Sequence, residues 1–302
     1  MDKKVIIIIY ILFLVVSCNN GNRSGQYIFQ EADATPFSEA ENLSSEAIAD
    51  IVKNIASPVE IANLLQILGV PFSHEYLAYS IDANKESSDF NRAMKLGIMG
   101  ADLGYLNMYE KTGSSFDILA AIKSLAEDLK VEQFFDIDLI KKLSQSRSKL
   151  DSLLFISINS YEKTDEYLRA NGRGQLSALM IIGMWIEGQY FATQVINNFP
   201  DNMLRDRIGE QKIILNDLLL LIAPYCNSSQ EVETLCEELY ALKESYKDVR
   251  ITYTQGDPVA TEKEGGLVIT QTETSEVEMT EEQLADIIKT ISKIRNLILL
   301  ND

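Results

Sequence analysis

Residues 96–105 read Leu-Gly-Ile-Met-Gly-Ala-Asp-Leu-Gly-Tyr, and they lie within a longer segment, 90–108, that is apolar on nearly all sides. A helix that is apolar around its whole circumference belongs in the interior of a protein. The glycines allow another backbone to come close, at a cost of about 1 kcal/mol each relative to alanine. Residues 176–195 have a similar composition, so we expect two central helices wrapped by amphipathic ones.

The two central segments also match each other at an offset of about 85 residues. Asp102 and Tyr105 fall on Glu187 and Tyr190, so each segment carries an acid followed three residues later by a tyrosine. Apolar helices match one another easily, which leaves internal duplication and chance similarity both open. The period is too long for tetratricopeptide or ankyrin repeats.

Most of the remaining chain up to residue 249 has the spacing of amphipathic helices, with recognisable start and stop signals. Ser57-Pro58-Val59-Glu60 is typical of a helix start, and Gly69 with Pro71 predicts where that helix ends. Ser88-Asp89 predicts the start of the first central helix, Gly113 its closure and Ser115 the cap of the next helix. Further helices are expected at about 136–170, 174–198, 202–225 and 230–249.

The sequence changes character after residue 249. Residues 250–254 alternate like a strand and 267–270 form a second short β-like run, and these two could pair as a small hairpin. Residues 272–282 are acidic, and we expect a mobile loop there. Thr280-Glu281-Glu282-Gln283 has the pattern of a capping box. It predicts a last helix, docked on the body, that carries Ile287, Ile291, Ile294 and Ile298.

The first residues have the pattern of an export signal. Lys3 and Lys4 precede an apolar run, Val5 to Val16, that is too short to span a bilayer, which needs roughly 20 apolar residues. Val15-Val16-Ser17-Cys18 then resembles the lipobox of bacterial lipoproteins. That resemblance implies cleavage after Ser17, a diacylglycerol on the Cys18 sulfur and, in many bacteria, a third acyl chain on the new amino group. The alternative is a plain cleaved signal followed by a chance cysteine.

The lipid anchor and the net charge together restrict what this protein can bind. Several acyl chains would hold the protein firmly to a membrane. No acidic run follows Cys18, and such a run is associated with surface display in some Bacteroidetes lipoproteins, so its absence favours a position facing the periplasm. The net charge of -18 opposes binding to nucleic acid and to anionic lipid. The partners that remain are the membrane, through the lipid anchor, and an envelope protein or a small ligand.

These patterns predict an all-α protein, a multi-helix bundle with two central apolar helices and a small β-hairpin near the C-terminus. We divide the chain into a signal peptide at 1–17, a lipidated tether at 18–35 and a helical domain at 36–249. Residues 250–302 form the hairpin, the acidic loop and the C-terminal helix.

The one histidine, His74, restricts the possible chemistry. A single histidine rules out a His-Glu-x-x-His zinc motif and a di-iron site with two Glu-x-x-His motifs. A Ser-His-Asp triad could use only His74, and no Gly-x-Ser-x-Gly motif accompanies it. No glycine-rich phosphate loop is present either. We therefore expect no metal and no cofactor.

Asp102, Tyr105, Glu187 and Tyr190 remain as candidates for a polar core or pocket. A buried carboxylate must be paired, protonated or hydrated. If the central helices face each other, the two acids could share a proton or a water, and the tyrosine hydroxyls one turn later could donate to them. The cluster is then either a small pocket for a ligand or for proton transfer, or a hydrogen-bonded network that fixes helix packing.

The two cysteines of the body, Cys226 and Cys236, could form a disulfide in an oxidising compartment. We place Cys226 at the end of one helix and Cys236 two turns into the next. This offset is expected to hold their Cα atoms further apart than a disulfide tolerates. The expectation is therefore two buried thiols, with a bridge as the alternative.

Residues 96–105 and the stretch Met184-Trp185-Ile186-Glu187-Gly188-Gln189-Tyr190 resemble stretches in uncharacterised helical lipoproteins of Bacteroidetes, over roughly residues 48–221. The resemblance implies a helical fold and an envelope location, and no functional residues. We expect a membrane-anchored, non-enzymatic binding or scaffold protein, and the alternative is an envelope hydrolase with a carboxylate pair. Acids about 5–9 Å apart in an open cleft would favour the hydrolase, while acids sealed in the bundle would favour partner binding.

Overall fold

A computed structural model describes residues 26–28, 58–78, 88–144, 150–255, 259–263, 266–270 and 273–300. Contacts along the chain divide it into two units, residues 1–27 with 253–274 and residues 28–252 with 275–302. Every helix that the structure describes belongs to the second unit. Cys18 and the segment 1–17 lie outside the described residues, and residues 26–28 of the expected tether form strand β1 (Gln26–Ile28).

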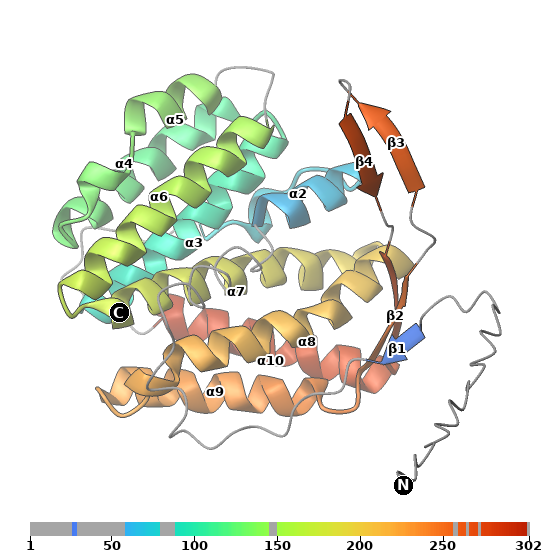
Figure 1. The fold of residues 1–302 in the computed structure, drawn as a ribbon. Coiled ribbons are helices and arrows are strands. Elements are labelled where there is room, and N and C mark those ends of the chain that lie inside the picture. The colour runs from blue at the N-terminus through green and yellow to red at the C-terminus, as the bar shows by residue number, and fades with distance from the viewer. Residues whose placement is uncertain are drawn as a thin grey trace, which may run out of the picture. The chain divides into compact units, whose positions relative to one another are not determined.

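The two central helices are confirmed as α3 (Asp89–Met108) and α7 (Gly174–Asn198), which pack against each other more extensively than any other pair of described elements (Figure 1). A Cβ added at Gly97 would overlap the backbone carbonyl of Met180, and one added at Gly183 would overlap that of Met94. Glycine is therefore required at both positions, because the backbones touch. This reciprocal approach is what a duplicated helix pair would produce, and duplication itself stays a prediction.

The remaining helices surround this pair. Helices α2 and α4 pack on α3, helices α2, α6 and α8 pack on α7, and α10 packs on α7 and α9. Their bounds are α2 (Pro58–Ile67), α4 (Thr112–Asp128), α5 (Ile137–Ser144), α6 (Leu150–Ala170), α8 (Asn202–Ile222), α9 (Gln230–Tyr246) and α10 (Glu281–Leu300). Short 3-10 turns lie at η2 (His74–Tyr76), η3 (Glu132–Phe134) and η4 (Ala223–Tyr225). The docking of the last helix on the helical body is thus observed directly.

Several helix ends agree with their sequence signals. Ser88 caps α3 by accepting a hydrogen bond from the Asn91 N–H. The capping box of α10 is confirmed, because the Thr280 N–H donates to Gln283 Oε1 at 2.7 Å and the Gln283 N–H donates back to the Thr280 hydroxyl at 3.2 Å. Gly69, with a φ of 72°, follows the end of α2 as expected.

Other helix ends were predicted wrongly. Helix α3 ends before Glu110, which adopts a φ of 55°, and Gly113 lies inside α4 instead of closing α3. Ser115 is not a cap, since its hydroxyl donates to the Lys111 carbonyl one turn earlier within the helix. The expected helix at 136–170 is described as two helices, α5 and α6, and residues 145–149 between them lie outside the described part.

The β elements also differ from expectation. Strands β3 (Val259–Lys263) and β4 (Gly266–Thr270) form the antiparallel hairpin, with Val259 opposite Thr270 and Lys263 opposite Gly266. Residues 250–254 belong to β2 (Arg250–Gln255), which does not pair with β4, so the expected pairing is wrong. Part of the acidic stretch forms β5 (Glu273–Glu278) rather than a loop, and the order of this second sheet is β1-β2-β5.

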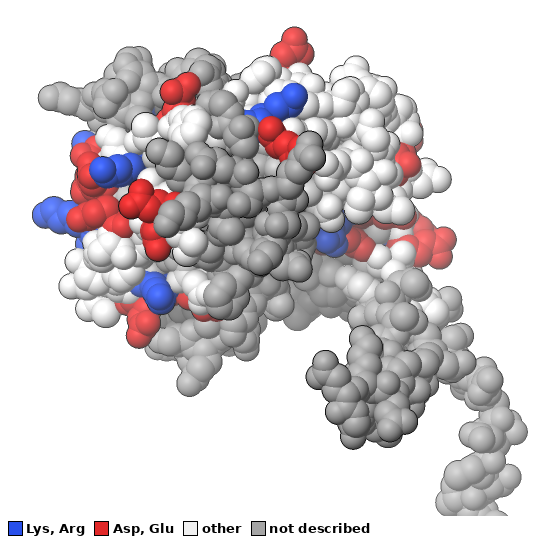
Figure 2. All heavy atoms as spheres, turned by 90° about the horizontal axis from the view of Figure 1, so that it is seen from above, with Lys and Arg blue, Asp and Glu red and all other residues white. Residues whose placement is uncertain are grey.

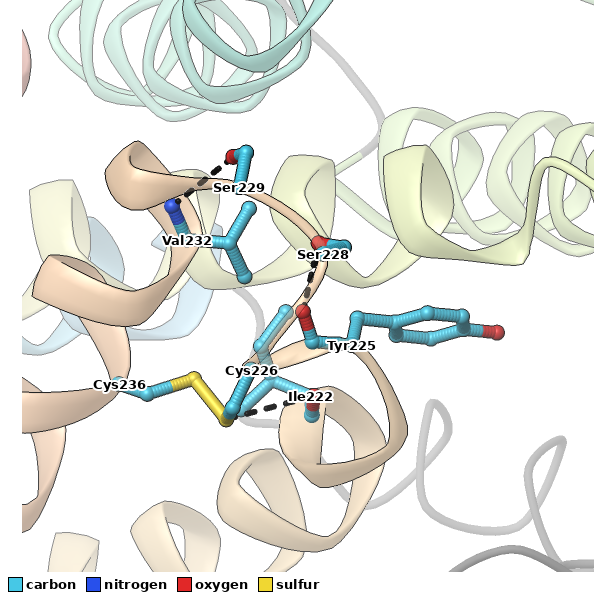
Figure 3. Close-up of a disulfide and its surroundings, with 7 residues drawn as sticks. All are labelled: Ile222, Tyr225, Cys226, Ser228, Ser229, Val232 and Cys236. Atoms are coloured by element: carbon cyan, nitrogen blue, oxygen red, sulfur yellow. Dashed lines mark hydrogen bonds between the residues drawn. A yellow bond between two sulfur atoms is a disulfide. The ribbon is translucent and has the colours of Figure 1, made fainter.

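Cys226 and Cys236 form a disulfide, and the expectation of two thiols is wrong (Figure 3). Their Cα atoms lie 5.9 Å apart, within the range that a disulfide spans. The separation is short because α8 ends at Ile222, and the 3-10 turn η4 then brings the chain back before Ser229 caps α9. The bridge therefore joins the turn after α8 to the second turn of α9.

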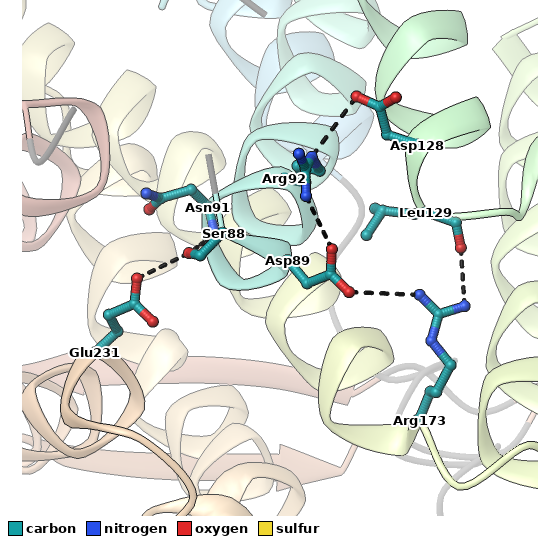
Figure 4. Close-up of polar contacts among 8 residues, drawn as sticks. All are labelled: Ser88, Asp89, Asn91, Arg92, Asp128, Leu129, Arg173 and Glu231. Atoms are coloured by element: carbon teal, nitrogen blue, oxygen red, sulfur yellow. Dashed lines mark hydrogen bonds and ion pairs between the residues drawn. The ribbon is translucent and has the colours of Figure 1, made fainter. Parts of the chain in front are cut away.

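Polar contacts join the ends of several helices (Figure 4). Asp89, in the first turn of α3, lies 3.8 Å from Arg173 at the start of α7. Arg173 also donates to the Leu129 carbonyl, where α4 ends, at 2.9 Å. Ser88 donates to Glu231, in the first turn of α9, at 2.8 Å. These partly exposed contacts set the positions of helix ends more than they add stability, since exposed ion pairs contribute about 1 kcal/mol or less.

The apolar character of the helices and the distribution of surface charge bear on whether the protein contacts a membrane or a nucleic acid. In the described part of the chain, no helix is both long enough and apolar enough to cross a bilayer. On the face shown in Figure 2, the coloured Lys and Arg side chains lie beside Asp and Glu side chains and form no stripe of positive charge. Mixed charges of this kind do not favour a nucleic acid on that face.

Candidate functional site

The most deeply buried ion pair in the described structure joins Glu187 of α7 to Arg295 of α10. Glu187 is fully buried and Arg295 is 6% exposed. Arg295 Nε donates to Glu187 Oε2 at 2.6 Å and Nη2 donates to Oε1 at 2.7 Å, so both carboxylate oxygens are bound. Nη2 also lies 3.2 Å from the Tyr76 carbonyl oxygen, as a donor to it. The guanidinium thus joins α10, α7 and the η2 turn.

Tyr190 covers one face of this guanidinium. It lies three residues after Glu187 on α7, and therefore on the same side of the helix. The Arg295 Cζ atom is 3.9 Å from the centre of the Tyr190 ring, a cation–π geometry. The ring accordingly covers the charge pair from one side and contributes an attractive contact in a buried site.

Asp102 of α3 is also fully buried, and its two carboxyl oxygens differ. Oδ2 accepts a hydrogen bond from the Ala78 N–H at 3.0 Å, whereas Oδ1 has no hydrogen-bond partner among the described residues. Burial raises the pKa of Asp102 well above its ordinary value, and the nearby Glu187 charge raises it further. The Arg295 charge and the Ala78 hydrogen bond oppose this only in part. Asp102 is therefore the protonated member of the acid pair.

Glu187 is the ionised member, because Arg295 contacts it directly. Burial is the larger influence and leaves the pKa of Glu187 raised, although the hydrogen bonds and the charge of Arg295 lower it in part. Burial alone would lower the pKa of Arg295, but its hydrogen bonds to Glu187 and the charge of that carboxylate leave it raised. The cluster of Asp102, Glu187 and Arg295 then holds one neutral acid and one compensated ion pair, which limits the cost of desolvation.

Tyr105 lies near this cluster but outside it. Its hydroxyl accepts a hydrogen bond from the Ser73 N–H at 3.0 Å, and its ring contacts Phe72 and Phe191. The expectation that the tyrosine hydroxyls donate to the acids is therefore wrong for Tyr105, and Tyr190 contributes its ring face. The structure brings together three of the four predicted residues.

Arg295 is the residue that sequence reasoning missed. It lies four residues after Ile291 and three before Ile298, on the apolar face that α10 docks on the body. An arginine within a stripe of buried isoleucines must find a buried anion, since an isolated buried charge is costly. The position of Arg295 on an apolar helix face could have indicated a buried ion pair. Nothing in the local sequence identifies Glu187 as its partner.

The geometry favours a structural network over a catalytic pair. Both oxygens of Glu187 are occupied by Arg295, and neither acid reaches solvent. A glycoside-type hydrolase with a carboxylate pair needs a free carboxyl on each side of the scissile bond and room for substrate. His74, the only histidine, is exposed and contacts the Phe72 ring edge-on. No three His, Cys, Asp or Glu residues gather as metal ligands in the described regions.

A second candidate is a groove of about 580 Å³ between α2 and α8. A volume of this order is typical of ligand sites. The groove combines apolar and charged residues, and is lined by Asn63, Leu64, Ile67, Met203, Asp206, Arg207, Glu210 and Ser275.

Comparison with known proteins finds no matching family model, no matching curated protein and no matching solved structure. The functional argument therefore depends on the residues of this chain and their geometry.

Proposed function

We propose that this chain is a lipoprotein of the cell envelope, anchored to a membrane through Cys18, that binds or scaffolds a partner and performs no catalysis. The observation that carries the anchor is the stretch Val15-Val16-Ser17-Cys18 at the end of the apolar run Val5 to Val16. A short apolar run behind two lysines is typical of export, and a cysteine at the cleavage point is the acceptor for acyl chains. The body would then face the periplasm.

The disulfide supports export. Disulfides form and persist in oxidising compartments and are rare where thiols are kept reduced. Cys226 and Cys236 are both buried, and the 5.9 Å between their Cα atoms suits a bridge. An exported protein can keep this bond, which a cytosolic one would be expected to lose.

The sealed acids support a role without catalysis. Asp102 and Glu187 are both fully buried, and Arg295 occupies both carboxylate oxygens of Glu187. The groove between α2 and α8, in contrast, is open to solvent and offers apolar and charged side chains to a partner. A rigid body with an open groove is suited to binding.

The anchor is tested by growing cells that express the full chain with radiolabelled palmitate. We expect wild-type protein to incorporate label and to fractionate with membranes. Cys18→Ala should incorporate none, whereas Cys226→Ala should be labelled as strongly as wild type, because its sulfur is not the acceptor. Equal labelling of wild type and Cys18→Ala, or no labelling of either, would show that the proposed anchor is wrong.

A further inference from the structure

The groove between α2 and α8 presents one face of each helix. Met203, Asp206 and Glu210 lie at intervals of three and four residues along α8, so they point to the same side. Leu64 and Ile67 are three residues apart at the end of α2. Residues from these two helix faces line the groove from opposite sides.

The apolar residues of this groove form exposed edges. Ile67 is 69% exposed and Met203 is 57% exposed, the two highest values among the large hydrophobic residues noted as exposed in the described structure. A small ligand would be enclosed by its pocket, which buries 70–90% or more of its surface. Side chains with such large exposed fractions are instead suited to contact with the surface of another protein. Methionine is common on surfaces that accept helical peptides, because its flexible side chain adapts to different shapes.

Negative charge predominates beside these apolar edges. Glu210 is paired with Arg207 at 3.0 Å and with the Ser275 hydroxyl. Asp206 has no ion pair or hydrogen bond within the described residues, and its neighbour Arg205 is bound to Glu281 at 2.7 Å. Burial raises the pKa of Asp206, and the charge of Glu210 raises it further. Glu276 and Asp201 also place negative charge near Asp206, and the charge of Arg205 opposes them only in part. A cation in the groove would offset this negative charge.

We propose that this groove binds a basic amphipathic helix from a partner protein, with aliphatic side chains against Ile67 and Met203 and a lysine or arginine against Asp206. This inference rests on the proposed binding function and names its partner by chemistry. In helix-in-groove recognition the bound helix presents apolar anchors at intervals of three and four residues to the groove. The cation contributes mainly to selectivity and to the rate of association.

The test measures fluorescence anisotropy of labelled peptides with the purified full-length chain. The probe is an amphipathic peptide of leucine and lysine, about 14 residues long and thus roughly four helical turns. One comparison peptide replaces every lysine by glutamate, and another scrambles the same residues so that no apolar face forms. We expect binding of the first peptide only, and weaker binding as salt rises.

Groove variants should weaken binding of the leucine–lysine peptide. Ile67→Ser and Met203→Ser are each expected to raise the dissociation constant about tenfold, because each removes a large apolar contact. Asp206→Asn is expected to raise it about threefold, since a charge at the edge of an interface contributes less. Ile67 and Met203 are exposed and Asp206 is half-buried, so thermal melts should show that the three substitutions leave folding unchanged.

Matched controls lie on the same helix, outside the groove. Leu220→Ser removes another exposed apolar side chain of α8, and Asp217→Asn removes another acid of α8. Both should bind as wild type does. Absence of binding, equal binding of the scrambled peptide, or equal weakening by the control variants would each overturn the assignment of the groove. Palmitate incorporation does not depend on any of these three binding results, so it tests the proposed anchor separately.

Discussion

Arg295 and Glu187 are 108 residues apart in sequence and are joined by two hydrogen bonds of 2.6 and 2.7 Å in the interior. The arginine comes from the last helix, and the glutamate comes from one of the two central helices. Because the same guanidinium binds the Tyr76 carbonyl and lies against the Tyr190 ring, it holds α10 to the body at three points. This pairing explains how a helix at the end of the chain docks in one position.

Arg295→Met should destabilise the protein strongly. The substitution leaves the Glu187 carboxylate buried without its cation, a change that typically costs about 3–5 kcal/mol. Urea unfolding, followed by circular dichroism, measures the free energy of unfolding. The double variant Arg295→Met with Glu187→Met should recover most of the loss, because it removes the buried charge together with its partner.

The partly exposed pair of Lys293 and Glu238 provides the control for that variant. It is as short as the buried pair, at 2.6 Å, but Lys293 is 65% exposed. Lys293→Met should therefore cost about 1 kcal/mol or less. If Arg295→Met costs no more than Lys293→Met, the buried pair does not hold α10 in place.

Asp102 should make stability fall as pH rises. Its pKa is raised in the folded state, so between its unfolded and folded pKa values the folded protein binds a proton that the unfolded chain has lost. Stability contributed by this proton is complete below the unfolded pKa, about 4, and is lost as pH rises through the folded pKa. Asp102→Asn cannot ionise and should lack this contribution. Its stability relative to wild type should rise by up to about 1.4 kcal/mol per pH unit in that window.

Unfolding free energies at a series of pH values test this. The asparagine can still accept the hydrogen bond from the Ala78 N–H, so folding should be preserved. Asp102→Leu also removes the charge, but it leaves that N–H without an acceptor and should be about 1–3 kcal/mol less stable than Asp102→Asn at every pH. Parallel pH profiles for wild type and Asp102→Asn would mean that Asp102 does not hold a proton in the folded state.

The sequence predicted the central helices well because their signal is local. Apolar residues around the whole circumference of 90–108 and 176–195 indicate burial whatever lies around them. The capping box at Thr280 and Gln283 is likewise complete within four residues. The Arg295 pairing could not be predicted, since it depends on how α10 docks, and no local pattern contains that information.

The predictions of strand pairing and of two free thiols were wrong for related reasons. Strand β5 carries one strongly apolar residue, Val277, which packs near Gly209 of α8, so its hydrophobic pattern was too sparse to detect. Pairing between distant strands is a tertiary property and local propensity predicts it poorly. The predicted cysteine distance is too long because it places Cys226 at the end of a helix, whereas α8 already ends at Ile222 and the η4 turn redirects the chain just before Cys226.

Gly97→Ala should destabilise the pair of central helices. A methyl group there would overlap the Met180 carbonyl, a backbone atom that cannot move without shifting α7. The expected cost is a few kcal/mol, in the upper part of the range for overpacked cores. Gly100→Ala is the control on the same helix, because its methyl would meet only the Tyr161 hydroxyl at 3.0 Å, the end of a side chain.

Thermal unfolding of both glycine variants distinguishes close packing from helix propensity. Alanine gains up to about 1 kcal/mol over glycine inside a helix, so Gly100→Ala should be near neutral. Gly97→Ala should lose far more than this gain. Equal and slightly raised melting temperatures for the two variants would show that α3 and α7 are not in backbone contact at Gly97.

Removing the Cys226–Cys236 bridge should lower stability by about 3 kcal/mol, the value expected from loop closure for a crosslink with a sequence separation of 10 residues. The variant Cys226→Ala with Cys236→Ala and reduced wild-type protein should unfold at nearly the same urea concentration, since both lack the same constraint. Thiol titration of the full-length Cys18→Ala variant under denaturing conditions should find free thiols only after reduction. Thiols reactive without reductant, or a double alanine variant as stable as oxidised wild type, would contradict a stabilising bridge between the turn after α8 and the second turn of α9.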